Sequence, residues 1–176
     1  KKNENLHHVK QLNKSFGFDC SNLHIHTSPT EEKEVEKIID KQNKYFVIFP
    51  GGNWNPKIWP VENYNTLLKK ISSKNQNIKY IFVGSNTEKD LYYNQLVSEI
   101  DNELIVDLFG STLTLTAAYM KKSNLFIGND SGLMHLSVAS NLKTIGLFGP
   151  TNDKIYAPTS TDSFVIRTDQ SYDYFK

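Results

Sequence analysis

Short apolar runs alternate with helical stretches along the chain from residue 45 onward. The runs are rich in β-branched and aromatic residues, and each ends in a turn of Gly, Asn or Pro, a pattern that predicts β-strands. Strands are expected at residues 45–49, 78–84, 103–108, 124–128, 143–149 and 163–167. The runs lack polar alternation, which is typical of a parallel sheet that is covered on both faces.

The segments between the runs have helical periodicity. In residues 60–71 apolar side chains return every three or four positions, and Pro60 fits the first helical position. Further helices are expected at residues 87–100 and 113–122. This alternation predicts an α/β fold for residues 45–176, a Rossmann-like doubly wound parallel sheet with strand order 3-2-1-4-5-6.

Residues 1–44 are polar and rich in charge, in contrast to the rest of the chain. Helices are expected at residues 7–19 and 28–41, the second capped by Ser28 or Thr30. We interpret residues 1–44 as a lead-in or linker to the domain that follows.

Composition indicates one water-soluble globular domain and excludes several classes of protein. The 176 residues are 38% hydrophobic and 22% charged, and no apolar run approaches the roughly 20 residues that a membrane span needs. Lys and Arg number 20 against 19 Asp and Glu, so the bulk charge gives no reason to expect nucleic acid binding. The single cysteine, Cys20, excludes an internal disulfide and favours a reducing compartment. The first residues, "KKNENLHHVK", hold neither an initiator Met nor a signal core, which is typical of a fragment of a longer protein.

Two loops of unusual composition follow the first and fourth predicted strands, where the strand order reverses. Ligands of open α/β sheets bind at this switch point, outside the carboxyl ends of the strands. In the first loop Gly51 and Gly52 permit close backbone approach, and Lys57 supplies a mobile positive charge. A phosphate or diphosphate is therefore the expected ligand.

The second loop, "GNDSGLMH", opens a helix. Asp130 can cap this helix, and the free N–H groups of Ser131, Gly132 and Leu133 would point at an anion. His135 follows about one turn later. A purely structural interpretation stays open, because glycine-rich turns are often only turns and Asp130 can be a plain N-cap.

Several familiar motifs are missing. Ser131 is not at the centre of a G-x-S-x-G elbow, the chain has no P-loop, and "GSNTEKD" lacks the glycine spacing of a dinucleotide fingerprint. His24 and His26 have the residue type of metal ligands. We nevertheless expect these two histidines, together with His7 and His8, to be solvated side chains of the lead-in, and we expect no metal site.

Three segments between about residues 45 and 158 carry motifs that occur together in one family. They are "FVIFPGGNWNPKIWPVENYNTLLKKI", "YIFVGSNTEKD" and "LFGSTLTLTAAYMKKSNLFIGNDSGLMHLSVASNLKTIGLFGPTNDKIYAP". In order and spacing they resemble the carboxy-terminal domain of glycosyltransferase family 9, the lipopolysaccharide heptosyltransferases. The resemblance implies the carboxy-terminal half of a GT-B enzyme, in which two Rossmann-like domains face a cleft and the second binds a nucleotide-sugar donor. Residues 1–44 resemble the interdomain segment, and the amino-terminal acceptor domain has no counterpart here.

The resemblance also assigns roles to residues. Lys57 would neutralise the diphosphate and Asp130 would hold sugar hydroxyls, which makes these two the expected catalytic residues. Glu88 would bind the ribose. The expected residues of the sugar-nucleotide site are Gly51, Gly52, Asn53, Lys57, Gly84, Ser85, Glu88, Leu108, Phe109, Gly110, Asp130, Ser131, Gly132 and His135, of which Leu108, Phe109 and Gly110 would border the base.

The implied activity is transfer of heptose from ADP-heptose to the inner core of lipopolysaccharide, with inversion and without metal or cofactor. Its general base would belong to the absent domain, so this chain is expected to bind the sugar nucleotide without turning it over. The lipid A-core acceptor would place the full enzyme in the cytoplasm, in peripheral contact with the inner face of the cytoplasmic membrane. Two alternatives stay open: a GT-B-like transferase or epimerase that uses another sugar nucleotide, and a non-catalytic nucleotide-binding module.

Overall fold

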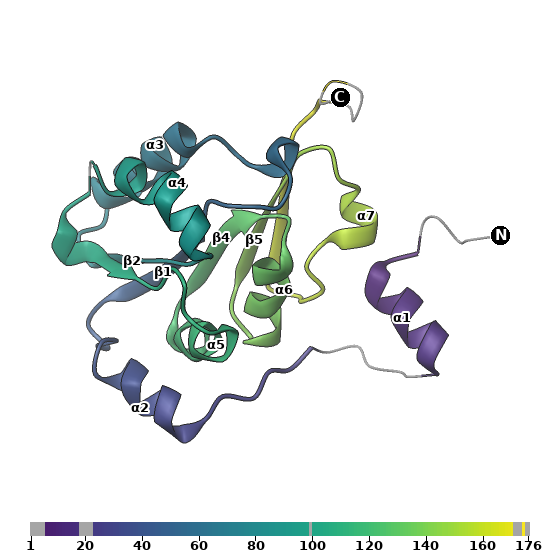
Figure 1. Ribbon diagram of the computed structural model, residues 1–176, viewed down its shortest axis with the longest axis horizontal. Helices are drawn as coiled ribbons and strands as arrows, with labels where there is room; N and C mark the ends of the chain where they lie inside the picture. Colours follow the sequence, from purple (N-terminus) through teal and green to yellow (C-terminus); the bar gives the residue numbers. More distant parts are fainter. Residues whose placement is uncertain (1–5, 18–22, 99, 171–173, 175–176) are drawn as a thin grey trace.

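A computed structural model of the protein describes residues 6–17, 23–98, 100–170 and 174 (Figure 1). Its centre is a six-stranded sheet in the order β3-β2-β1-β4-β5-β6, in which every neighbouring pair is parallel. The predicted fold class and strand order are confirmed. The strands are β1 (Lys44–Phe49), β2 (Ile78–Phe82), β3 (Ile105–Asp107), β4 (Leu125–Asn129), β5 (Thr144–Phe148) and β6 (Ser163–Arg167).

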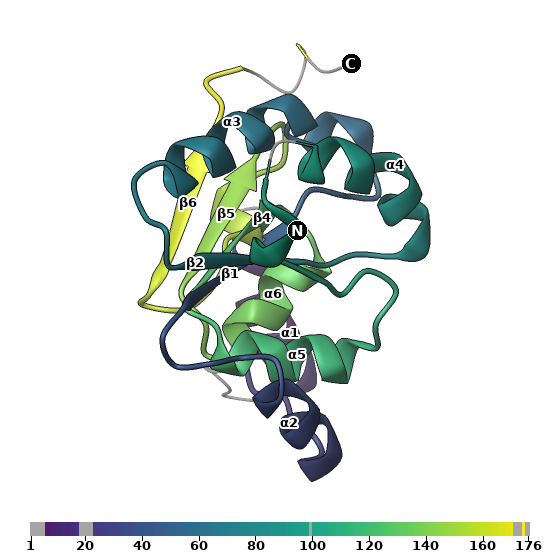
Figure 2. The same ribbon diagram turned by 90° about the vertical axis from the view of Figure 1, so that its left-hand side faces the viewer.

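Helices cover both faces of the sheet, which explains why the strands lack polar alternation. Figure 2 shows α3 and α4 on one face and α5 and α6 on the other. Along β1, Val47 packs into the hydrophobic cluster that contains α5 and α6 residues, while Ile48 packs into the cluster that contains α3 and α4 residues. The helices are α1 (His8–Phe16), α2 (Pro29–Glu36), α3 (Val61–Ser72), α4 (Asn86–Val97), α5 (Leu113–Lys122), α6 (Gly132–Ala139) and α7 (Asp153–Tyr156), with 3-10 turns η1 (Asn55–Lys57) and η2 (Asn102–Leu104).

Local capping decides where the helices begin. Ser28 caps α2, as predicted, and its side chain and that of Glu31 form a reciprocal capping box. Pro60 was expected inside α3, but it is the N-cap residue because its backbone is extended, with ψ of 138°, and the helix begins at Val61. Strand β3 is shorter than predicted, because η2 occupies residues 102–104.

Part of the predicted lead-in packs against the domain. Helix α2 lies against α5, and the side chain of Val35 is completely buried in the core. The Thr27 hydroxyl also accepts a hydrogen bond from Lys121 Nζ at 2.8 Å. The boundary at residue 44 stays a prediction, but α2 contributes to the core.

The amino-terminal histidines do not behave alike. His7 was expected to be solvated, but its Nε2 atom lies 2.9 Å from the Ala157 carbonyl oxygen, so its side chain ties α1 to the end of α7. His24 and His26 are exposed, as expected. Cys20 and residues 18 and 19, at the end of the first predicted helix, lie outside the described residues.

Candidate functional site

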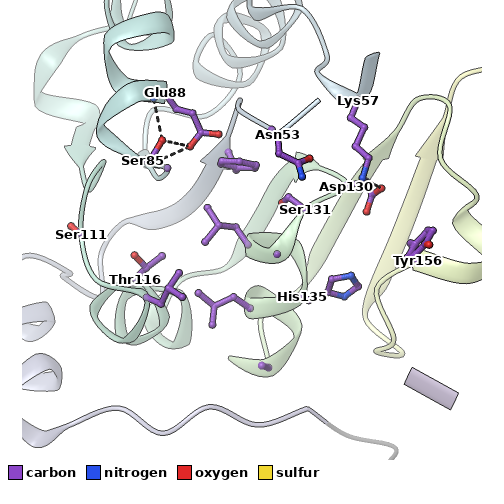
Figure 3. A pocket seen from close by; sticks show the side chains of 18 of the residues that line it. Asn53, Lys57, Ser85, Glu88, Ser111, Thr116, Asp130, Ser131, His135 and Tyr156 are labelled. Carbon is purple, nitrogen blue, oxygen red and sulfur yellow. Dashed lines mark hydrogen bonds and ion pairs between the residues drawn. The ribbon is translucent and has the colours of Figure 1, made fainter. Parts of the chain in front are cut away.

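A cleft of about 1090 Å³ opens at the carboxyl ends of the strands. Its walls come from the loops after β1, β2, β3 and β4 and from α6, so the two loops singled out in the sequence do face the same space (Figure 3). The strand order reverses between β1 and β4, so the chain leaves these two strands toward opposite faces of the sheet. A crevice opens between the two loops at this point.

An ion pair lies at one end of the cleft. Lys57 Nζ, on the turn η1, is 2.9 Å from Asp130 Oδ2, at the end of β4 (Figure 3). The side chains are only 20% and 6% exposed, respectively. At this distance the ammonium and the carboxylate form a close, charge-assisted contact that is largely shielded from water. A carboxylate has more lone pairs than one ammonium contact uses, so Asp130 can also accept hydrogen bonds from donor groups of a ligand.

Asp130 does not cap the helix that follows, contrary to the sequence-based interpretation. Ser131 is the N-cap residue of α6, and its hydroxyl accepts the N–H of Met134 at 3.4 Å. The reason is the chain path: the Asp130 side chain extends toward η1, and the next residue has the extended backbone of an N-cap. The first N–H groups of α6, at Gly132 and Leu133, have no acceptor within the helix, and both residues line the cleft.

His135 lies on α6 one turn beyond the ion pair and is half-buried in the cleft wall. Burial lowers the pKa of its imidazole, the negative charge of Asp130 opposes this effect, and the nearby His7 and His8 lower the pKa further. His8 and Tyr156, whose ring centroids are 5.9 Å apart, border the same end of the cleft. A neutral imidazole is therefore favoured at this position.

A carboxylate is fixed at the opposite end of the cleft. Ser85 caps α4, and Glu88 Oε2 accepts hydrogen bonds from the Ser85 N–H at 2.7 Å and from the Ser85 hydroxyl at 2.9 Å (Figure 3). This capping box holds the Glu88 side chain in one place, while no hydrogen bond is recorded for Oε1 among the described residues. Gly110 faces this end with φ of +74°, a conformation that other residues rarely adopt.

The structure brings most of the predicted site residues to one cleft. Those that line it are Gly52, Asn53, Lys57, Gly84, Ser85, Glu88, Gly110, Asp130, Ser131, Gly132 and His135. Gly51 is buried behind the cleft wall, against the side chain of Glu88. Leu108 and Phe109 are also buried, because their side chains pack into the two hydrophobic clusters on opposite faces of the sheet.

Other residues of the cleft wall carried no local signal. Ser111 and Thr116 border it from the loop after β3 and from α5, and His8, His24 and Tyr156 reach it from distant parts of the sequence. Only the fold unites these positions. A hydroxyl within a largely apolar helix, as at Thr116 in "LTLTAAYM", is the one local hint that could have been followed.

Two classes of feature are missing from the described part of the chain. Residues 6–17, 23–98, 100–170 and 174 contain no group of three or more His, Cys, Asp or Glu side chains that could hold a metal ion. Within the same ranges, no helix is long and apolar enough to cross a membrane.

Known proteins share both the sequence pattern and the fold. A family model described as glycosyltransferase family 9 (heptosyltransferase) matches residues 5–175. Lipooligosaccharide heptosyltransferase 2 of Haemophilus influenzae is 26% identical over 152 residues, which cover 82% of this chain and 44% of that enzyme. The chain thus spans less than half the length of this relative.

Two solved structures have the same fold at low sequence identity. The family 9 glycosyl transferase of Veillonella parvula superposes with a TM-score of 0.82 at 21% identity, covering 95% of this chain and 50% of that one. The ADP-heptose lipopolysaccharide heptosyltransferase II of E. coli superposes with a TM-score of 0.71 at 23% identity, covering 85% of this chain and 46% of that one.

Proposed function

Because this chain belongs to glycosyltransferase family 9, the heptosyltransferase family, we propose that it is the half of a GT-B glycosyltransferase that binds the nucleotide-sugar donor. The observation that carries the proposal is the Lys57–Asp130 pair beside the first turn of α6, facing the fixed carboxylate of Glu88 across one cleft. These groups match the parts of a nucleoside diphosphate sugar: an anionic diphosphate between a ribose and a second sugar.

We assign the diphosphate to Lys57 and to the first N–H groups of α6. Lys57 is the one lysine or arginine among the described residues of the cleft wall, and its three N–H donors exceed what one ion pair uses. Charge builds on the leaving diphosphate as the glycosidic bond breaks. A positioned ammonium group and backbone N–H groups stabilise that charge, and this chemistry needs no metal ion.

We assign the two sugars to the two carboxylates. The Asp130 carboxylate has acceptor capacity beyond its ion pair with Lys57, so hydroxyls of the transferred sugar can donate hydrogen bonds to it. Glu88 Oε1 is available to the ribose hydroxyls, as an acidic residue is in dinucleotide-binding folds. Ser111 and Thr116 lie toward the same end of the cleft (Figure 3), where the base would bind. Gly110 lies there too, since its N–H donates to the Gly84 carbonyl oxygen at 2.8 Å.

The proposed sugar donor is ADP-heptose, the compound named for the E. coli structure with this fold, and the proposed acceptor is the lipopolysaccharide inner core. We propose that the acceptor and its general base belong to the part of the family that this chain does not cover, and that transfer inverts the anomeric centre. The complete enzyme would then work at the inner face of the cytoplasmic membrane, where its lipid acceptor is.

Calorimetric titration of ADP and UDP into this chain in the presence of EDTA tests the proposal. We expect ADP to bind more tightly than UDP, and Lys57→Ala to weaken ADP binding by about 1.5 to 3 kcal/mol, the usual contribution of a hydrogen bond to a charged group. Lys74→Ala is the matched control, because Lys74 follows α3 at the opposite end of the strands.

Each other outcome contradicts a stated part of the proposal. Tighter binding of UDP would favour a transferase or epimerase for another sugar nucleotide. Equal binding by wild type and Lys57→Ala would remove Lys57 from the site. If neither nucleotide bound, the donor-binding assignment of this chain would be wrong.

A further inference from the structure

The cleft depends on a buried amide that the proposed function does not use. Asn129 is the last residue of β4, immediately before Asp130, and its side chain is completely buried. Its Nδ2 group donates to the carbonyl oxygens of Pro50 at 2.9 Å and Gly51 at 2.8 Å. Its Oδ1 atom accepts the N–H of Trp59 at 3.1 Å. Two acceptors on one side and a donor on the other fix the orientation of the amide.

Tyr64 of α3 completes this arrangement. Its hydroxyl lies 3.1 Å from Asn129 Oδ1 and 3.1 Å from the Phe49 carbonyl oxygen, and it can donate its proton to either. Burial raises the pKa of this phenol, so the proton stays on the oxygen. The Tyr64 ring also packs edge-on against Trp59, with centroids 4.9 Å apart. Asn129 and Tyr64 together hold both ends of the loop between β1 and α3.

The middle of that loop is held from the other side. A Cβ atom on Gly149, after β5, would lie 2.6 Å from the Pro56 carbonyl oxygen and 3.8 Å from the Lys57 Cα atom. The backbone of the turn η1 therefore rests on the backbone of Gly149, while Asn129 holds the flanking residues. Lys57 has little freedom to move away from Asp130.

We propose that Asn129 is a positioning residue for the Lys57–Asp130 pair. It touches no ligand; it fixes the loop that carries Lys57 relative to the strand that carries Asp130. Asn129 is adjacent in sequence to Asp130. Its hydrogen bonds reach the loop on both sides of Lys57, at Pro50 and Gly51 before it and at Trp59 after it. Without the amide, two buried carbonyl groups and one N–H would lose their partners, and the loop would have to move to recover them. The role in nucleotide binding rests on the proposed function.

The test asks whether Lys57→Ala still weakens ADP binding when Asn129 has been replaced by alanine. In otherwise wild-type protein we expect Lys57→Ala to weaken ADP binding by about 10- to 100-fold, and in an Asn129→Ala background by less than about threefold. A residue that only stabilised the fold would leave the effect of Lys57→Ala unchanged. Full Lys57 dependence in the Asn129→Ala background would overturn the proposal.

A matched control and a milder variant make this test independent of overall stability. Thr144→Val removes a hydroxyl that is equally buried in the same sheet, bonded to Ser137 and Leu142, and should leave the effect of Lys57→Ala at full size. If Asn129→Ala fails to fold, Tyr64→Phe gives a milder comparison, because it removes the hydroxyl that supports the Asn129 amide and should reduce the effect of Lys57→Ala only in part.

A measurement without ligand separates this proposal from the proposed function. If wild-type protein does not bind ADP, the nucleotide assignment fails, but the positioning role is still decided by urea unfolding of Lys57→Met, Asp130→Asn and the double variant. We expect an interaction energy between Lys57 and Asp130 in otherwise wild-type protein that disappears in the Asn129→Ala background and is reduced in the Tyr64→Phe background. An unchanged interaction energy would overturn the positioning role.

Discussion

At the scale of the single residue, His135 shows how the cleft shifts a titration. Burial disfavours the charged imidazolium and lowers the pKa of His135, and the nearby His7 and His8 lower it further. The negative charge of Asp130 acts in the opposite direction. Between the folded pKa and the ordinary value of 6.5, the unfolded chain therefore binds a proton that the folded chain does not. Because the unfolded state takes up more protons in this window, acid favours unfolding there.

We therefore expect His135→Gln to flatten the pH dependence of stability. In wild type, the free energy of unfolding should fall as the pH is lowered from above 6.5 through the folded pKa of His135, and the variant should lack this contribution. Urea unfolding of both proteins between about pH 8 and about pH 5 measures the difference. Parallel curves for the two proteins would show that burial does not perturb this imidazole.

At the scale of the element, the chain uses the same capping box twice with different consequences. Ser28 with Glu31 begins α2, and Ser85 with Glu88 begins α4. Both serines satisfy the N–H of the third helical residue, so each contributes in the same way to its helix. Only the second box lies in the cleft, where it also holds the proposed ribose ligand, Glu88.

The two caps provide a matched pair of variants. We expect Ser85→Ala and Ser28→Ala each to lower the free energy of unfolding by about 1 kcal/mol, the usual effect of losing an N-cap side chain. Only Ser85→Ala should also weaken ADP binding, because it removes the hydroxyl that donates one of the two hydrogen bonds holding the Glu88 carboxylate, leaving the one from the backbone N–H. Chemical unfolding and calorimetry on the same samples measure both quantities. Equal ADP affinity in the two variants would argue against ribose binding by Glu88.

At the scale of the whole molecule, the core extends beyond the predicted sheet domain. Val35 of α2 is completely buried among residues of β1, α5 and α6, whereas Ile38, just after the same helix, is 47% exposed. The Tyr45 hydroxyl donates to the Ile38 carbonyl oxygen at 3.1 Å, so the segment after α2 is also tied to β1. The helix should therefore unfold together with the sheet.

Truncation of these two side chains tests this cooperativity. We expect Val35→Ala to lower the free energy of unfolding by about 2 kcal/mol, because it removes buried methyl groups and leaves a cavity. Ile38→Ala removes a larger side chain from an exposed position and should change stability by less than about 0.5 kcal/mol. Urea unfolding followed by far-UV circular dichroism gives both values. Similar small effects would mean that α2 is only a linker.

The sequence by itself determined the six strands, their order in the sheet, the main helices between them and the edge at which the cleft opens, but not α7 or the short turns η1 and η2. Strand and helix periods are local, and the right-handed connection between parallel strands leaves few ways to arrange them. The loops after β1 and β4 were therefore predictable as neighbours, and Lys57 and Asp130 as residues of one site. The ligand contacts of these residues stay predictions.

Only the tertiary structure decided which side chains act on each other. Asp130 pairs with Lys57, so Ser131 caps α6 instead, and His7 binds a carbonyl 150 residues away in the sequence. Asn129 could not be distinguished from a turn residue in "GNDSG", because its partners lie 65 to 79 residues earlier in the chain. Such contacts depend on strand register and on the exact path of loops. A local pattern of polar and apolar residues does not specify the strand register or the loop path, whereas the packing of the core fixes both of them.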